Sequence, residues 1–222
     1  LIPYIRGSKK PFVLVSTGTW SVSLNPYSDS SLTIDDIKKD TINYMRINGK
    51  AVKSAKLLLG NEYKHQVTEL SKHFKVSYEH HKSVKFNNDT FHKLSENFKH
   101  CFSWKDLSDI DMPKETTILH ATYEEAYHQL MIELVQLQVK SIAFAKGDDS
   151  SIKRLFAEGA FSDNEVFINL LSHYLRDMKL RSTSSSLGSA LGAAIVISDN
   201  KLNSKFLKEN YALKKHVPFI AK

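Results

Sequence analysis

The sequence predicts an α/β fold, with short strands near the start of the chain and again after a long central helix. Residues 12–24 contain two β-branched or aromatic-rich runs, FVLV and WSVSL, joined by the polar turn STGT, which predicts a hairpin. Residues 122–145 carry the longest helical periodicity of the chain. Residues 153–175 change from a strand-like run to an apolar helical pattern at the turn EGA, so a further strand and helix are expected.

The first fifty residues are predicted to form a small β-meander. After the hairpin, the Asn-Pro pair at residues 25–26 ends the second strand. Residues 41–47 alternate well enough for a third strand, and the Asn-Gly pair at residues 48–49 is typical of a tight hairpin turn.

The segment that follows is predicted to be largely helical. Residues 54–70 place apolar side chains on one face at the 3.6-residue period. Gly60 costs such a helix about 1 kcal/mol unless another part of the backbone must approach it. Residues 74–86 are predicted to be an extended connector, and Asn88 or Asp89 is predicted to cap a second helix.

Cap signals mark the helices of the second half. Thr122 and Glu125 have the spacing of a capping box at the start of the long helix. Ser162 or Asp163 is predicted to cap the helix that follows the EGA turn. A short strand is predicted at residues 178–181.

The composition is that of a chain able to bury a sizeable core. Of 222 residues, 41% are hydrophobic, and the longest strongly apolar run, residues 190–197, is far shorter than the roughly 20 residues that span a membrane. The single cysteine, Cys101, cannot form an internal disulfide, so we expect a reducing, cytoplasmic location without membrane attachment. Because the chain opens abruptly on Leu1, we expect a fragment.

The formal net charge of +7 raises the question of nucleic-acid binding. Lysines and histidines gather in residues 64–105, interleaved with aromatic residues and without any arginine. Arginine is the residue that usually makes bidentate hydrogen bonds to phosphates and bases. We therefore favour a solvated lysine-rich surface over a nucleic-acid-binding face.

A polar stripe on the long helix raises the question of a metal site. His120, Glu124 and His128 recur every four residues and could share one side. Metal sites usually need a third or fourth convergent ligand, so we favour an ordinary polar stripe and assign no metal ligand.

Two turns are candidate phosphate sites. In STGT, Gly18 permits φ > 0, and hydroxyls such as those of Thr17 and Thr19, with the main-chain amides, are donors that can wrap an anion. The turn at residues 158–160 leads from a strand into a helix N-terminus, where free N–H groups and the helix dipole favour negative charge. Either turn alone is common, but the two together predict a nucleotide-phosphate site.

Five blocks in this order resemble the C-terminal domain of FGGY carbohydrate kinases, especially rhamnulokinase and fuculokinase-like members. They are STGTWSVSLNP, KSAKLLLGNE, AYHQLMIELVQLQ, FAEGAFSDNEVFINLL and SSSLGSALGAA. The resemblance implies one ribonuclease H-like (actin-like ATPase) domain over residues 1–222. Such a domain has a mixed sheet flanked by helices, here with the N-terminal β-hairpin meander and a helical insertion.

The resemblance also implies that the chain is half of an enzyme. Kinases of this family bind sugar mainly through an N-terminal domain that is absent from this sequence, and their general-base aspartate is expected just upstream of Leu1. The whole protein would transfer the γ-phosphoryl group of ATP, with Mg²⁺, to a hydroxyl of a ketose or deoxyketose such as rhamnulose, fuculose or xylulose. Its partners would be the sugar, MgATP and the missing domain; the sequence leaves a homodimer open.

Five site residues carry over from the family pattern. Gly18 and Thr19 match its second phosphate loop. Gly159 and Ala160 match the glycine pair of its adenosine loop. Asn164 matches its adenine-contacting polar residue. The family commonly has glycine where this chain has Ala160, so we expect the methyl group either to shift the nucleotide or to impose an unfavourable φ.

Two other functions compete with the kinase half. One is a non-catalytic nucleotide-binding or interaction module, a degenerate relative in which Ala160 marks lost phosphate contact. The other is a basic nucleic-acid-binding domain that uses residues 64–105. The role of Glu158 is open between stabilising its turn and contacting metal-bound water. Magnesium typically keeps several waters and few carboxylates, so no protein ligand is assigned to it.

Overall fold

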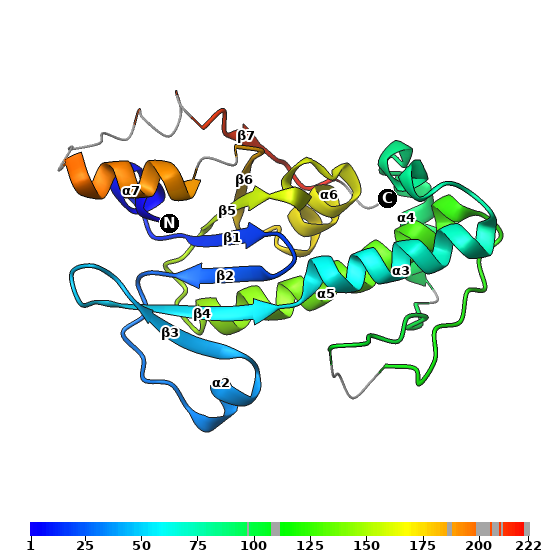
Figure 1. Ribbon diagram of the computed structural model, residues 1–222, viewed down its shortest axis with the longest axis horizontal. Coiled ribbons are helices and arrows are strands. Elements are labelled where there is room, and N and C mark those ends of the chain that lie inside the picture. Colours follow the sequence, from blue (N-terminus) through cyan, green and yellow to red (C-terminus); the bar gives the residue numbers. More distant parts are fainter. Residues whose placement is uncertain are drawn as a thin grey trace.

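Seven strands of the chain form one mixed sheet in the order β3-β4-β2-β1-β5-β6-β7 (Figure 1). The structure is a computed structural model that describes residues 1–96, 98–107, 112–185, 188–198, 205, 209 and 211–219. The strands are β1 Val13–Thr17, β2 Ser21–Asn25, β3 Thr41–Met45, β4 Ala51–Leu57, β5 Arg154–Gly159, β6 Lys179–Thr183 and β7 Lys214–Lys215.

The α-helices of the described residues lie on both faces of this sheet. They are α1 Ile2–Gly7, α2 Ile34–Lys38, α3 Leu59–Phe74, α4 Asn88–Glu96, α5 Tyr123–Lys146, α6 Glu165–Tyr174 and α7 Gly188–Ser198. Two 3₁₀ helices, η1 Tyr78–Ser83 and η2 Ala160–Asp163, join them. The connector predicted at residues 74–86 therefore contains a helical turn.

The strands of the predicted meander are present, but their order differs from the order of the chain. β3 and β4 form the predicted hairpin through the turn at Gly49, whose φ is +78°. However, β4 rather than β3 pairs with β2. The reason is burial: β4 buries residues such as Val52 and Ala55, whereas only Thr41 is buried in β3, which suits an edge position.

The helix predicted from residue 54 begins five residues later. Residues 51–57 are β4, and α3 starts at Leu59. A short apolar run fits both the strand and the helix period, so periodicity alone placed this boundary too early.

The predicted start of the long helix is confirmed, whereas two other caps lie elsewhere. Thr122 Oγ1 accepts a hydrogen bond from the Glu125 amide at 3.2 Å and caps α5. The cap of α6 is Asn164 rather than Ser162 or Asp163, since its Oδ1 accepts from the Phe167 amide.

The cap of α4 lies one residue before the first of its two predicted positions. Asn87 Oδ1 accepts from the Thr90 amide at 2.9 Å, so Asn87 takes the place predicted for Asn88 or Asp89. The amide of Asn87 is itself bound to a buried side chain of α5, which fixes where α4 begins.

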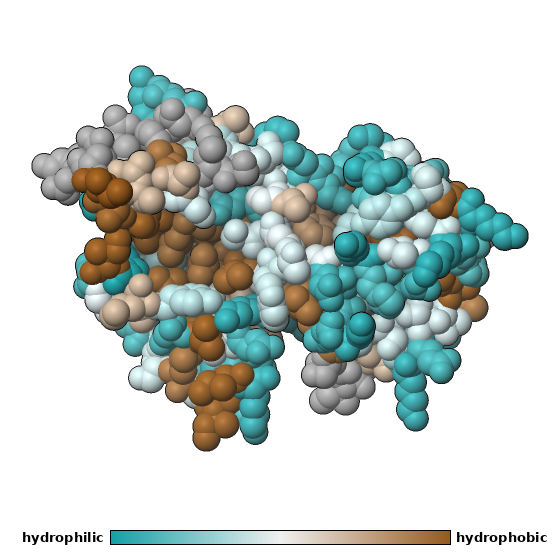
Figure 2. Space-filling model, viewed as in Figure 1, coloured by the Kyte–Doolittle hydropathy of each residue, from teal (hydrophilic) through white to brown (hydrophobic). Residues whose placement is uncertain are grey.

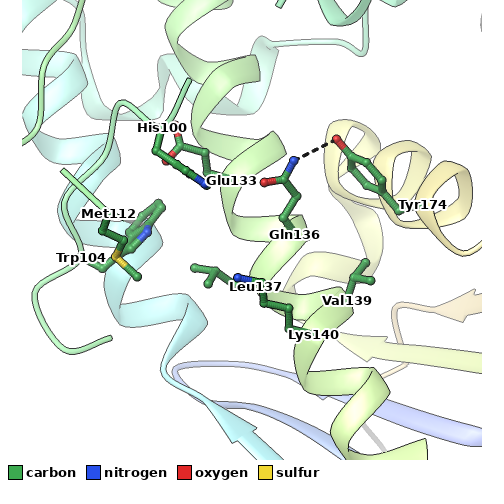
Figure 3. Close-up of a pocket in the computed structure, with 9 residues that line it drawn as sticks. All are labelled: His100, Trp104, Met112, Glu133, Gln136, Leu137, Val139, Lys140 and Tyr174. Atoms are coloured by element: carbon green, nitrogen blue, oxygen red, sulfur yellow. Dashed lines mark hydrogen bonds and ion pairs between the residues drawn. The ribbon is translucent and has the colours of Figure 1, made fainter. Parts of the chain in front are cut away.

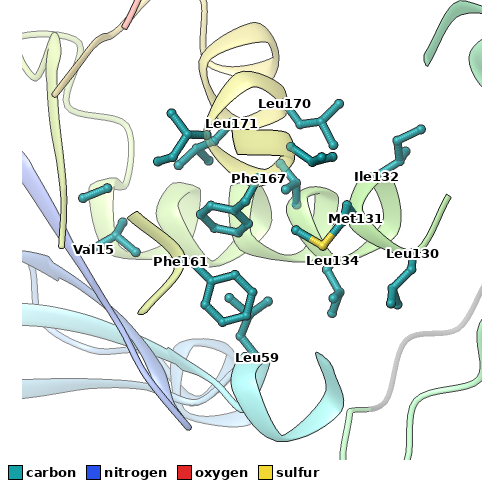
Figure 4. Packing of buried hydrophobic residues seen from close by; sticks show 14 of the residues in the cluster. Val15, Leu59, Leu130, Met131, Ile132, Leu134, Phe161, Phe167, Leu170 and Leu171 are labelled. Atoms are coloured by element: carbon teal, nitrogen blue, oxygen red, sulfur yellow. The ribbon is translucent and has the colours of Figure 1, made fainter. Parts of the chain in front are cut away.

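Two hydrophobic clusters lie on opposite faces of the sheet. The larger one packs α3, α5 and α6 against inward side chains of β1 and β5, such as Val15 and Leu155; Figure 4 shows part of it. The smaller one joins Tyr4 of α1 to Leu14 and Phe156, with α7 alongside. Alternate residues of β1 and β5 thus supply both cores, as expected for central strands.

The contact between β2 and α5 is polar although it is buried. Ser21 Oγ bonds to Gln138 Oε1 at 2.5 Å, and Ser23 Oγ lies 3.2 Å from Ser141 Oγ. Asn25 Nδ2 donates to a carbonyl at the end of α5. Because these buried polar groups have hydrogen-bond partners, which offset the cost of removing them from water, the interface fixes the position of α5 on the sheet.

The two ends of the molecule differ in surface character. Figure 2 shows hydrophilic side chains over the end that carries α3 and α4, and hydrophobic ones near α7. No helix among the residues that the structure describes is long and apolar enough to cross a membrane. Ser186 and Leu187 of the block SSSLGSALGAA lie outside the described residues.

His128 of α5 is held as a neutral ring. The ring is buried, Nδ1 donates to the Glu124 carbonyl at 2.7 Å, and Nε2 accepts from the Asn87 amide at 3.0 Å. A ring nitrogen that accepts cannot carry a proton, and burial lowers the pKa of His128 below its usual value.

We expect acid to destabilise the protein through this histidine. In the unfolded chain the pKa of His128 returns to about 6.5, so below that pH the unfolded state takes up the proton first and the free energy of unfolding falls. Each tenfold preference of the folded state for the neutral ring corresponds to about 1.4 kcal/mol. Urea denaturation between pH 7.5 and pH 5 measures the loss.

The control is His128→Gln, whose amide oxygen can still accept from Asn87 but does not titrate. In this variant the free energy of unfolding should fall less steeply between pH 7.5 and pH 5. It should still fall, because burial also lowers the pKa of three other histidines. These are His120, His173 and His216. An equally steep fall in the free energy of unfolding would show that His128 does not contribute to the loss of stability in acid.

Candidate functional site

The two predicted phosphate turns lie side by side at one edge of the sheet. β1 and β5 are parallel neighbours, and Thr17 at the end of β1 pairs with Gly159 at the end of β5. Both turns therefore begin at the same height along the sheet. This edge, outside the carboxyl ends of parallel strands, is where ligands bind in open α/β sheets.

Gly159 can only be glycine at this position. Its φ of +91° is rarely adopted by residues with a side chain, and an added Cβ would lie 2.0 Å from the Thr17 carbonyl oxygen. The second turn is thus pressed directly against the strand that carries the first.

The Thr17 side chain ties the two turns together. Its hydroxyl donates to the Glu158 carbonyl at 2.7 Å and accepts from the Phe161 amide at 3.1 Å, and the residue is buried. Thr17 was a candidate ligand-binding residue on the strength of its hydroxyl. That hydroxyl is engaged with the protein, so its role here is to position the turns.

The first turn presents bare backbone and one free hydroxyl. Gly18 does not have the positive φ expected of it; the described glycines that do are Gly49, Gly147 and Gly159. Its amide donates to the Trp20 carbonyl within the turn.

Thr19 is exposed at the tip of this turn. Within the part of the chain that the structure describes, neither its amide N–H nor its hydroxyl has a hydrogen-bond partner. Both donors are therefore available to a ligand.

The first turn of α3 closes onto this loop. The Gly60 amide donates to the Thr19 carbonyl at 3.0 Å, and a Cβ on Gly60 would lie 2.2 Å from the Gly18 carbonyl oxygen. Close backbone approach therefore explains the glycine that interrupts the helical pattern.

These elements enclose a cavity of about 560 Å³, here named the two-turn pocket. Its wall consists of the first turn, the start of α3, residues of the segment 78–85 and residues of the segment 160–165. Four of the six predicted site residues line it, namely Gly18, Thr19, Ala160 and Asn164. Thr17 and Gly159 form the junction between the turns.

Ala160 fits its position without backbone strain. It is exposed at the pocket, begins η2, and is not among the described residues with positive φ, which besides glycines are Asp40, Lys75 and Ala212. Of the two effects expected of Ala160, the unfavourable φ is therefore excluded, and a shift of the nucleotide stays a prediction. The preceding Gly159 takes up the unusual conformation instead.

Asn164 is held by a hydrogen-bond chain that reaches across the pocket wall. Besides capping α6, it donates from Nδ2 to Tyr127 Oη at 2.8 Å, and Tyr127 Oη lies 2.9 Å from Tyr63 Oη. Burial raises the pKa of both phenols, so they stay neutral. The sequence did not indicate this chain, because its members come from three helices.

The second turn is anchored in the hydrophobic core. Phe161 follows Ala160 directly, is 4% exposed, and packs against Phe167 with ring centroids 5.1 Å apart. Figure 4 shows Phe161 between Phe167 and Leu59, the first residue of α3. One core side chain thus fixes both the turn and the helix that face the pocket.

Three lysines of the predicted lysine-rich surface line the two-turn pocket. They are Lys64, Lys82 and Lys85, and the carboxylates on the same wall are Asp163 and Glu165. Aromatic rings of the wall, including Tyr63 and Phe161, lie beside these charges. The basic segment therefore contributes to a concave site, which its composition did not indicate.

Other candidate groups make contacts within the protein. Glu124 Oε1 pairs with His80 Nε2 at 2.9 Å, and Glu158 Oε2 accepts from the Tyr4 hydroxyl at 2.8 Å on the face of the sheet that carries α1. Burial raises the pKa of the Cys101 thiol, which disfavours the reactive thiolate. Among the residues that the structure describes, no three metal-ligating side chains converge.

A second cavity of about 330 Å³ lies on the outer side of α5 (Figure 3). Its buried carboxylate, Glu133, accepts from the Cys101 and Phe102 amides and from Gln129 Nε2. The carboxylate fastens the loop before α5 and has little capacity left for a ligand. None of the predicted site residues lines this cavity.

The two-turn pocket fits a nucleotide better than a bound metal ion alone. Its volume lies within the usual range for small-molecule sites, and it combines the free amide and hydroxyl of Thr19 with cationic side chains and aromatic rings. Those features suit phosphates at one end and a base at the other. A magnesium ion would arrive with the phosphates and keep most of its waters.

The fold is ribonuclease H-like, a mixed sheet flanked by helices, with the two predicted phosphate turns at one edge of the sheet. Residues 9–93 match the family described as carbohydrate kinase FGGY, C-terminal domain. That segment is similar to an FGGY kinase C-terminal domain, in agreement with the family that the sequence blocks indicated. No curated protein sequence matches the chain.

Solved kinases share the fold at low sequence identity. Xylulose kinase from Rhodospirillum rubrum superposes with a TM-score of 0.65 at 14% identity, covering 97% of this chain and 44% of its own. A carbohydrate kinase from Novosphingobium aromaticivorans superposes with a TM-score of 0.64 at 15% identity, covering 96% of this chain and 45% of its own. Plasmodium falciparum glycerol kinase with ADP superposes with a TM-score of 0.55 at 14% identity, covering 87% of this chain and 39% of its own. The chain spans less than half the length of these proteins.

We expect Gly159→Ala to destabilise the protein by about 3 kcal/mol or more, because it combines backbone strain with a clash against Thr17. Gly49→Ala is the matched control: its φ is also positive, but nothing lies within 4 Å of an added Cβ. It should cost only about 1–2 kcal/mol. Urea denaturation measures both, and equal losses would mean that the Thr17 contact is unimportant.

Proposed function

We propose that this chain is the ATP-binding half of a cytoplasmic sugar kinase. With its missing N-terminal domain it would transfer the γ-phosphoryl group of MgATP to a hydroxyl of a ketose or deoxyketose. The observation that carries the proposal is the meeting of two phosphate-type turns, far apart in sequence, around one pocket in which both donors of Thr19 are free.

The residues of the pocket would act mainly by positioning. The amide and hydroxyl of Thr19 would hold the terminal phosphates, and the backbone at Gly18 would let them approach. Ala160 and Asn164 would border the adenosine, with Asn164 oriented by Tyr127. Phosphoryl transfer needs little covalent chemistry from the protein, so rigid placement of the triphosphate is the expected contribution of this half.

A nucleotide role is favoured over nucleic-acid binding. Three lysines of the basic segment line the concave pocket, and two others, Lys72 and Lys93, pair with Glu69 and Glu125. The glycerol kinase with the same fold was crystallised with ADP, which supports a nucleotide as the ligand.

In the full-length protein, Thr19→Ala should weaken MgATP binding about 2- to 10-fold, because one hydroxyl donor is lost. Gly18→Val should weaken it more. A Cβ at Gly18 would lie 3.7 Å from the Trp20 carbonyl oxygen, which is an ordinary van der Waals contact, so the variant should fold. The valine side chain would, however, occupy space in the pocket.

Isothermal titration calorimetry measures both affinities. Thr68→Ala is the control, since this exposed hydroxyl of α3 bonds only within its own helix. Unchanged MgATP affinity in both pocket variants would refute the assignment of the first turn.

Ala160→Gly should retain MgATP affinity or increase it. The substitution removes a methyl group from the pocket wall, and the φ of residue 160 suits either residue. The same titration measures this, with the melting temperature as a check on folding. A clear loss of affinity without a loss of stability would show that the methyl group contacts the nucleotide favourably.

A further inference from the structure

Lys64 of α3 lines the two-turn pocket close to the first turn. It lies four residues after Gly60 on α3, so both residues are on the same face of the helix, one turn apart. Helical side chains lean toward the helix N-terminus, which directs the lysine stem back over the turn of Gly60. That turn is the one bonded to Thr19.

The other charged groups of the pocket wall have ion-pair partners. Lys82 pairs with Glu79, Lys85 Nζ lies 3.5 Å from Glu165 Oε2, and Asp163 Oδ1 lies 3.7 Å from Lys214 Nζ. Lys64 is exposed, and within the described residues no carboxylate comes within ion-pair distance of its ammonium group. The pocket therefore keeps one uncompensated positive charge beside the first turn.

We propose that Lys64 binds the terminal phosphates of the nucleotide and makes the pocket selective for nucleoside triphosphates over less charged forms. The inference rests on the proposed function and adds a ligand that neither phosphate turn contains. The ammonium group of Lys64 would donate charge-assisted hydrogen bonds to oxygens of the terminal phosphates, which Thr19 would contact from the other side. It would also offset the negative charge of the triphosphate where the transferred group is held.

The selectivity follows from the position of the charge. Adenosine would occupy the wall formed by residues 160–165 and the aromatic rings, and would leave Lys64 in water. Each added phosphate would bring more negative charge toward Lys64, so its contribution should grow from adenosine to ADP to ATP. The attraction is partly exposed and should weaken as the salt concentration rises.

The test is calorimetric titration of the full-length protein and its Lys64→Gln variant with MgATP, ADP and adenosine. We expect the Kd for MgATP to rise about tenfold or more, the Kd for ADP to rise less, and the Kd for adenosine to stay within twofold. Lys64→Arg, which keeps the charge, should restore most of the MgATP affinity. Raising the salt concentration should weaken MgATP binding more in the unmodified protein than in Lys64→Gln.

The matched control is Lys72→Gln, on the same helix but outside the pocket, where the lysine pairs with Glu69. It changes the net charge equally and should leave all three affinities within twofold. Failure of the unmodified protein to bind any nucleotide would overturn the proposed function itself. Normal MgATP binding by Lys64→Gln, or an equal loss for adenosine and MgATP, would overturn only the role of Lys64.

Discussion

The contact between Gly159 and Thr17 is the constraint on which the rest of the site depends. Two parallel strands end at the same level, and the missing side chain of Gly159 lets its backbone lie against the carbonyl of Thr17. The Thr17 hydroxyl then bonds to both sides of the second turn. A residue with a side chain at position 159 would separate the strands, and the two turns would no longer face one pocket.

A second close approach, at Gly60, adds the helix α3 to this junction. It brings Lys64 and Tyr63 to the wall of the pocket, while Phe161 and Leu59 fix the same elements from the core side. The pocket is therefore held by packed side chains and by a chain of hydrogen bonds rather than by loops alone. Such a preorganised site loses little conformational entropy when a ligand binds.

The polar interface between β2 and α5 shows what sequence patterns leave open. In β2 the serines alternate with Val22 and Leu24, and the pattern alone does not say what the serines contact. They face α5, where Ser21 bonds to Gln138 and Ser23 to Ser141, whereas Leu24 packs against the smaller cluster on the other face of the sheet. These hydrogen-bond partners lie more than a hundred residues away in the chain, and no local pattern contains that information.

The sequence by itself determined the α/β class, most strands, the start of the long helix and the two glycine turns, because these depend on local periodicity and on backbone freedom. Tertiary structure decided the order of β3 and β4, the inward role of the Thr17 hydroxyl, the cap at Asn164 and the arrival of Lys64 at the pocket. Each of these depends on which residues meet in space. Close contacts at Gly60 and Gly159 bring together segments far apart in the chain, and only the folded backbone specifies them.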